Sequence, residues 1–204
     1  IPQKGDQLKL ITMCKNNATQ KLLEKLSSSE KTKNALEELA LMLGMKNIPE
    51  YIESYDISHT AGSDNVAGMI VFKDGRPYKK AYRRFAIKGF VGQDDYASME
   101  EVLRRRFTEY YNHKDSNEEY GFGKLPDLIL LDGGKGQVNA VLPLFKDRNI
   151  KVFGLVKDRK HRTRGIISVD GEVDIRTNPA VFKFFTLLQD EVHRFAITYM
   201  NSKK

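Results

Sequence analysis

The chain has 204 residues, of which 40% are hydrophobic and 30% are charged, and its formal net charge at pH 7 is +7. This length suits one α/β domain with an appendage, and the composition is that of a globular protein able to bury a full core. No apolar run approaches the roughly 20 residues of a membrane span, no signal peptide is visible, and the single Cys14 excludes a disulfide framework and a cysteine-cluster metal site.

The excess of basic residues favours an anionic partner, most often nucleic acid. A merely basic surface is the alternative, which composition alone does not exclude. The chain starts at Ile1 without an initiator Met and stops abruptly at Lys204, so we expect an excised fragment.

The first part of the chain is predicted to be helical. Apolar residues recur at three- and four-residue steps over residues 6–44, and the cluster Ser27–Glu30 predicts a break into two helices. Gly44 ends the second helix, and Pro49 forbids its continuation. We therefore predict an N-terminal helical segment over residues 1–46 and a second domain over residues 47–204.

The rest of the chain alternates predicted strands and helices, and no repeats or low-complexity tracts are found. The helix over 95–111 is expected to bury a stripe that includes Tyr96. In chain order the predicted elements are strands at 51–57, 66–72 and 78–88, helix 95–111, an exposed loop over 112–124, a strand ending at Asp132, helix 135–148, strand 151–157, a hairpin about Asp170-Gly171 and helix 179–201.

Four apolar residues lead into a carboxylate at a glycine turn in Asp127-Leu-Ile-Leu-Leu-Asp132-Gly-Gly-Lys-Gly-Gln137. This run predicts a buried parallel strand that delivers Asp132 to its carboxyl end, the sheet edge where α/β proteins usually bind ligands and metals. The strand at 51–57 carries Asp56 in the same way. Asp132 could also be an ordinary turn residue, whereas a carboxylate inside an apolar strand is uncommon unless it is paired or metal-bound. Two acidic strand ends in a basic chain predict metal ions held by carboxylates and a surface that recruits a polyanion.

Three antiparallel strands, a helix, a strand, a helix and a further strand form the element order of the ribonuclease H-like fold. We therefore predict an α/β fold, a ribonuclease H-like mixed sheet flanked by helices, with an N-terminal helical extension. That fold places the first and fourth strands side by side and parallel, so Asp56 and Asp132 would converge on one site. Element order alone is shared by many α/β domains.

Six motifs make the assignment more specific. They are Tyr55-Asp-Ile-Ser-His-Thr60, Tyr82-Arg-Arg-Phe85, Asp94-Asp-Tyr-Ala-Ser-Met99, Val102-Leu-Arg-Arg-Arg-Phe107, Leu131-Asp-Gly-Gly-Lys-Gly-Gln137 and Glu191-Val-His-Arg-Phe-Ala-Ile197. In this order they resemble the C-terminal endonuclease domain of the UvrC family, the incision nucleases of bacterial nucleotide excision repair. The resemblance extends from about Ile1 to Thr198.

The resemblance implies a metal-dependent endodeoxyribonuclease that cuts damaged double-stranded DNA on the 5′ side of a lesion, as part of the UvrABC system in the bacterial cytoplasm. It implies a catalytic set of Asp56, Asp132 and His193, with Asp95 as a further acidic residue. The family's other parts, including the segment that docks on UvrB and the helix-hairpin-helix DNA-binding module, are not found in this chain. We expect UvrB to be a partner of the full-length protein and the fragment to be monomeric, with no membrane contact.

Divalent metal ions supply what phosphodiester hydrolysis needs, which is charge neutralisation and an activated water. Mg²⁺ or Mn²⁺ is the expected cofactor because both prefer hard oxygen ligands. The resemblance makes Asp56, Asp132 and His193 the ligands, and His193 could instead carry a proton. Asp95 could simply cap the helix that begins there, and a lone helix histidine is often structural.

Basic residues outside this set are predicted to contact DNA. The loop Lys157–Arg164 is the densest basic segment, and Arg159, Lys160, Arg162 and Arg164 are expected to follow the DNA backbone. Lys135, at a helix N-terminus, is expected to touch a backbone phosphate or the site carboxylates. Solvated charges are the alternative in both places. A catalytically silent ribonuclease H-like module that binds nucleic acid or a repair partner is the alternative function, and the presence of all three catalytic residues favours the nuclease.

Overall fold

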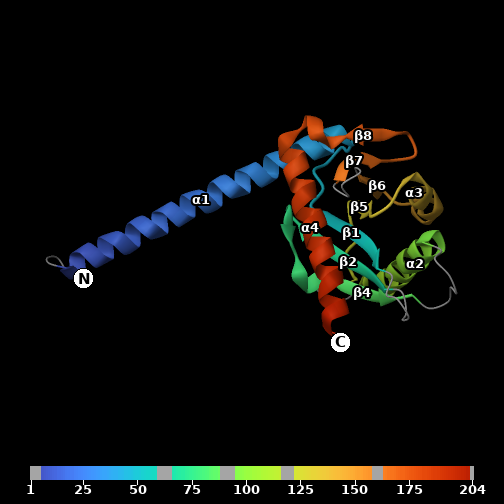
Figure 1. The fold of residues 1–204 in the computed structure, drawn as a ribbon, viewed down its shortest axis with the longest axis horizontal. Coiled ribbons are helices and arrows are strands. Elements are labelled where there is room, and N and C mark those ends of the chain that lie inside the picture. Colours follow the sequence, from blue (N-terminus) through green and yellow to red (C-terminus); the bar gives the residue numbers. More distant parts are fainter. Residues whose placement is uncertain (1–5, 59–65, 88–94, 116–121, 158–162, 203–204) are drawn as a thin grey trace.

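The computed structural model describes residues 6–58, 66–87, 95–115, 122–157 and 163–202 (Figure 1). Its elements are, in chain order, α1 (Asp6–Met42), β1 (Tyr51–Ser58), β2 (Val66–Lys73), β3 (Arg76–Pro77), η1 (Lys79–Ala81), β4 (Arg83–Ala86), α2 (Asp95–His113), β5 (Leu128–Leu131), α3 (Lys135–Val141), η2 (Leu142–Phe145), β6 (Lys151–Lys157), β7 (Thr163–Ile167), β8 (Glu172–Asp174), η3 (Ile175–Thr177) and α4 (Pro179–Ser202). None of the described helices is long and apolar enough to cross a bilayer.

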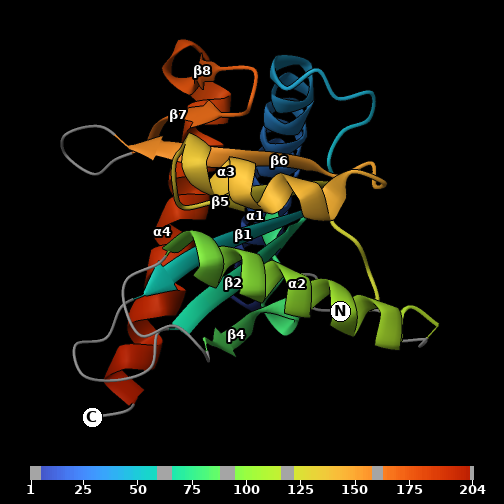
Figure 2. The ribbon, with the colours of Figure 1, turned by 90° about the vertical axis from the view of Figure 1, so that its right-hand side faces the viewer.

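The described strands form one mixed sheet between two layers of helices. The strand order is β3-β2-β1-β5-β6-β7-β8, and β4 pairs with β2 beside this path. The pairs β1–β5 and β5–β6 are parallel, and the other pairs are antiparallel. The end of α1 and α4 cover one face, and α2 and α3 cover the other (Figures 1 and 2). The predicted ribonuclease H-like arrangement, with its N-terminal helical extension, is confirmed.

The predicted break in the N-terminal helix is wrong, because α1 runs through Ser27–Glu30 as one helix of 37 residues. Serine is a weak helix former but not a breaker, and α1 contains neither Gly nor Pro. Local contacts support the exposed turns, including a hydrogen bond from Thr32 Oγ1 to the carbonyl of Ser28 at 2.9 Å. Only the last turns reach the domain, where Leu36, Leu39 and Leu43 are buried. Most of α1 therefore projects away from the sheet (Figure 1).

Two further predicted elements are shorter than expected. The strand at 78–88 is reduced to β4, because the chain leaves β2 after Pro77, forms η1 and pairs again with Val66–Met69 only from Arg83. The helix at 135–148 ends at Val141 and continues as the 3₁₀ turn η2, since Pro143 cannot donate the backbone hydrogen bond that an α-helix needs. The other strands and helices lie within a few residues of their predicted bounds.

The predicted burial of Tyr96 is also wrong. Its side chain is 55% exposed, whereas Met99, Leu103 and Phe107 of the same helix are buried as expected. Tyr96 lies in the first turn of α2 and packs its ring against Gly136 of α3. The ring thus covers the neighbouring helix instead of entering the core.

A buried ion pair ties α2 to β1. The side chains of Arg106 and Glu53 are both fully buried, and Arg106 donates from Nε and Nη2 to Glu53 Oε1 at 3.1 and 2.7 Å. Arg106 also donates to the carbonyls of Phe122 and Lys124, and the Tyr55 hydroxyl donates to Glu53 Oε2 at 2.6 Å. Burial, followed by the Glu53 charge, raises the pKa of Tyr55, so its hydroxyl stays a neutral donor. The network fixes β1 three residues before Asp56.

Candidate active site

Asp56 and Asp132 lie near the carboxyl ends of two adjacent parallel strands, Asp56 two residues before the end of β1 and Asp132 directly after β5. The last register pair of β1 and β5 is Tyr55 with Leu131, so the two aspartates are the next residues of each strand. The backbone N–H of Asp132 donates to the carbonyl of Tyr55 at 2.9 Å, which holds the two ends together. The expected fold predicted that these two strands are parallel neighbours, and the strand pairing confirms it. That the two aspartates share one site stays a prediction.

The side chain of Asp56 faces the α4 side of the sheet. Glu53 and Tyr55 point towards Arg106 of α2 on the opposite face, and successive strand residues alternate between faces. Asp56 is 9% exposed, which is low for a carboxylate. Phe195 of α4 lies 3.4 Å from the Cβ position of Gly68, the antiparallel partner of Asp56, so α4 crosses the sheet next to this aspartate.

Lys157 is a site residue that the sequence analysis did not single out. Its ammonium donates to Asp132 Oδ2 at 2.6 Å from the end of the neighbouring strand β6. The pair is partly buried, with 32% of the Lys157 side chain and 17% of the Asp132 side chain exposed. A lysine at the end of a strand carries no local signal of this role, because the contact depends on the parallel pairing of β5 and β6.

Asp95 lies in the same pocket as Asp132. The pocket has a volume of 910 Å³ and is lined by Asp95, Tyr96, Asp132, Gly133, Gly134, Gln137, Leu155, Val156 and Lys157. Asp95 is the first residue of α2, where a carboxylate also stabilises the helix N-terminus. Its position is compatible with both predictions, in which Asp95 either stabilises the start of the helix or belongs to the acidic site.

His193 is exposed on α4 and lines a second pocket of 650 Å³, with Lys157, Thr163, Phe182, Thr186, Gln189 and Asp190. Lys157 lines both pockets and so connects the surroundings of His193 with Asp132. Among the described residues, no group of three or more His, Cys, Asp or Glu side chains lies close enough together to hold a metal ion. Metal ligation by His193 therefore stays a prediction.

The two neighbouring aspartates nevertheless fit a divalent cation. Mg²⁺ is usually held by one or two carboxylates, and its remaining positions are filled by water and substrate phosphates. The ammonium of Lys157 at Asp132 shows that this strand end already accepts a positive charge at short range. Asp56 and Asp132 are thus the described side chains that would hold the metal.

Gln137 is another site residue that sequence reasoning missed. It lies within the glycine motif after Asp132, lines the Asp132 pocket and is 8% exposed. Its Oε1 is buried without a hydrogen-bond partner among the described residues, which is uncommon for a native polar group. The amide lies so close to Gly133 that a Cβ there would overlap it. The glycine motif therefore makes room for an amide acceptor beside Asp132.

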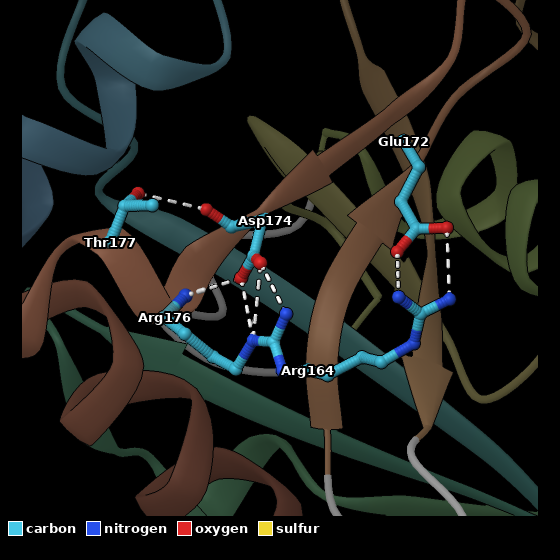
Figure 3. A network of polar contacts seen from close by, with 5 residues as sticks. All are labelled: Arg164, Glu172, Asp174, Arg176 and Thr177. Carbon is cyan, nitrogen blue, oxygen red and sulfur yellow. Dashed lines mark hydrogen bonds and ion pairs between the residues drawn. The ribbon is translucent and has the colours of Figure 1, made fainter.

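The predicted DNA-binding residues are only partly described. Arg159, Lys160 and Arg162 lie outside the described residues. Lys135 is exposed at the start of α3, next to the lining of the Asp132 pocket. Arg164 pairs with Glu172 across the β7–β8 hairpin, with Nη1 2.9 Å from Oε1, while Asp174 binds Arg176 (Figure 3). DNA contact by these residues stays a prediction, and Arg164 would have to share its charge with Glu172.

Comparison with known proteins adds to this geometry. A family model described as the UvrC RNAse H endonuclease domain matches residues 40–197, which include both aspartates, Asp95 and His193. The chain belongs to this family. The UvrC-family resemblance of the six motifs is thereby confirmed.

Curated UvrC-family relatives match the chain over nearly its whole length. UvrABC system protein C from Clostridium perfringens is 47% identical over 215 residues, which cover 99% of this chain and 35% of that protein. The homologue from Clostridium acetobutylicum is 46% identical, with 99% and 34% covered. The chain therefore spans about a third of the length of these relatives.

Among solved structures, an endonuclease V variant from Ciona intestinalis, in complex with an inosine-containing 23mer DNA, is similar to the chain at 14% identity. The match covers 66% of this chain and 58% of that one, with a TM-score of 0.41.

Proposed function

We propose that this chain is a metal-dependent DNA endonuclease domain that makes the 5′ incision next to a lesion in bacterial nucleotide excision repair. The observation that carries the proposal is the placement of Asp56 and Asp132 on adjacent parallel strand ends, in a chain of the UvrC endonuclease family. Damaged double-stranded DNA is the substrate, and UvrB is the partner of the longer protein in the UvrABC system.

The cofactor is Mg²⁺ or Mn²⁺, held by Asp56 and Asp132. When bound there, it supplies charge neutralisation at the scissile phosphate and lowers the pKa of an attacking water. Asp56 and Asp132 sit on rigid strands, so their carboxylates are positioned before substrate arrives.

Lys157 and His193 complete the site from the α4 side. The Lys157 ammonium orients the Asp132 carboxylate and adds positive charge where the phosphate must approach. His193 faces solvent across a pocket that Lys157 also lines, so its ring is accessible to a bound strand. There it serves as a further metal ligand or as the group that carries a proton to the leaving oxygen.

The test is nicking of supercoiled plasmid DNA by the chain in Mn²⁺, with Asp132→Asn as the variant. We expect the nicking rate to fall by roughly a hundredfold or more, because one metal-holding carboxylate is lost while the side-chain shape is kept. Asp127→Asn is the matched control, since Asp127 lies at the other end of β5 and accepts hydrogen bonds from the backbone of Glu50 and Tyr51.

The control should nick at the wild-type rate, because Asn can still accept these bonds. Calorimetric titration with Mn²⁺ alone should show binding to the wild type and weaker binding to Asp132→Asn. Full nicking by Asp132→Asn would contradict the proposal, and wild-type protein that never nicks DNA would favour the silent binding module. The position of the cut is read with a longer protein that carries the UvrB-docking segment, on a lesion-containing duplex loaded with UvrB.

A further inference from the structure

A third pocket, which we call the arginine pocket, lies between the η1–β4 segment and α4. Its volume is 430 Å³ and its lining residues are Lys79, Tyr82, Arg83, Arg84, Arg194 and Phe195. Of these described lining residues, four are basic and none is acidic. This composition differs from that of the Asp132 pocket, which two aspartates line.

The guanidinium of Arg84 is held in place by an aromatic surface. It lies 4.1 Å from the centre of the Phe195 ring, and its Nη2 donates to the Phe195 carbonyl at 3.3 Å. Tyr82 packs edge-on against the same ring, with the two ring centres 5.1 Å apart. Stacking on an aromatic face orients a guanidinium without neutralising it. The pocket thus presents an ordered positive charge.

Glu191 neutralises only part of this charge. Arg194 donates to its two oxygens at 2.6 and 2.8 Å, and the Tyr82 hydroxyl donates to Oε1 at 3.0 Å. Among the described residues, four basic side chains line the pocket and one carboxylate, that of Glu191, pairs with them. An anionic ligand is therefore favoured there.

The arginine pocket is next to the candidate active site. Arg194 directly follows His193 along α4. Phe195, on which Arg84 stacks, packs against Gly68, the strand partner of Asp56. A polyanion that reaches the aspartates along this side of α4 would therefore pass over the pocket.

We propose that the arginine pocket binds a backbone phosphate of the DNA strand that flanks the scissile bond. The inference rests on the proposed endonuclease function and adds a substrate contact to it. Guanidinium and ammonium groups recognise phosphate oxygens by charge and by paired N–H donors, without reading the base sequence. The lining supplies such donors from three elements, η1, β4 and α4, so one phosphate can bridge them.

The experiment measures DNA binding by fluorescence anisotropy, using a labelled DNA duplex in EDTA across a series of salt concentrations. The test variant is Lys79→Ala with Arg84→Gln. The control is Lys146→Ala with Lys151→Ala, which removes the same charge from two exposed positions, one after η2 and one at the amino end of β6, away from the aspartates. Each lost phosphate contact should reduce the slope of log Kobs against log salt by about 1.

We expect the test variant to lose roughly tenfold in affinity at low salt and to have a shallower slope, while the control keeps a slope close to that of the wild type. Equal slopes for the two double variants would overturn the inference, and so would a wild-type chain that does not bind DNA. Lys79→Glu at an exposed position serves as a second variant if the first fails to fold. Because EDTA prevents metal-dependent hydrolysis, this result is independent of the Asp132 nicking test.

Discussion

The glycine after Asp132 decides how closely the Gln137 amide approaches the strand end. Gly133→Ala would place a Cβ inside the space that the amide occupies, so the side chain of Gln137 would have to move. We expect plasmid nicking to fall by at least about tenfold, and the free energy of unfolding to fall by about 1–3 kcal/mol, the usual cost of overpacking.

Gly134→Ala is the control for this change, because nothing lies within 4 Å of a Cβ at Gly134 and its backbone is extended, with φ −85° and ψ −168°. It should leave nicking within about twofold of the wild type. The nicking rates and the urea unfolding curves of the Gly133→Ala and Gly134→Ala variants are compared with those of the wild type. Equal effects at the two glycines would show that the position of Gln137 is unimportant.

Candidate site residues could be predicted from the sequence where the residues next to them in the chain indicate their position in a strand or turn. Asp132 follows four apolar residues and precedes two glycines, so its place at a strand end could be inferred locally. Lys157 and Gln137 could not be found this way, because their roles depend on contacts with β5 and with Gly133. The proposal that Asp56 and Asp132 share one site depends on the fold that the element order indicated.

Among the elements, the link between α2 and β1 depends on the buried pair of Arg106 and Glu53. Arg106→Met should lower the free energy of unfolding by about 3–5 kcal/mol, since it leaves a buried carboxylate without its cation. It also removes the donors to the carbonyls of Phe122 and Lys124. Urea denaturation followed by circular dichroism measures the change.

Arg104→Met is the comparison, because Arg104 lies on the same helix and pairs with Glu100 on the surface, with 64% of its side chain exposed. Its cost should be below about 1 kcal/mol. If the two substitutions cost the same, the buried pair does not join α2 to the sheet as inferred.

Helices and strands could be predicted where the pattern of apolar residues and the positions of Gly and Pro indicate the same element bounds. The strand before Asp132 has four consecutive apolar residues, and α4 begins at its Pro179. The break predicted at Ser27–Glu30 is wrong because serines often mark a helix end. A helix without Gly or Pro can nevertheless continue through them in solvent. The division of residues 78–88 depends on where β2 offers pairing partners, which is a tertiary property.

For the whole molecule, the boundary predicted at residue 46 can be tested by truncation. Removing residues 1–33 should leave the midpoint of thermal unfolding nearly unchanged, because this part of α1 is almost entirely exposed. Removing residues 1–46 should lower it by roughly 10 °C or more, since the buried Leu36, Leu39 and Leu43 are lost from the core.

Differential scanning calorimetry of the two truncated chains and the full chain gives the comparison. A protein of residues 47–204 as stable as the full chain would support the predicted boundary. A large loss only in this shorter chain would instead move the start of the folded domain to within the last turns of α1.

The proposed site takes its two aspartates and His193 from positions 56, 132 and 193, so it spans most of this chain. The parallel pairing of β1 with β5 cannot form before the intervening segments have been made, and the α4 side stays open until the last helix docks. During synthesis on the ribosome, an unfinished chain would therefore hold separated acidic residues without a shared cation site. The proposed DNA-cutting activity would therefore require that synthesis has passed α4 and that this helix has docked.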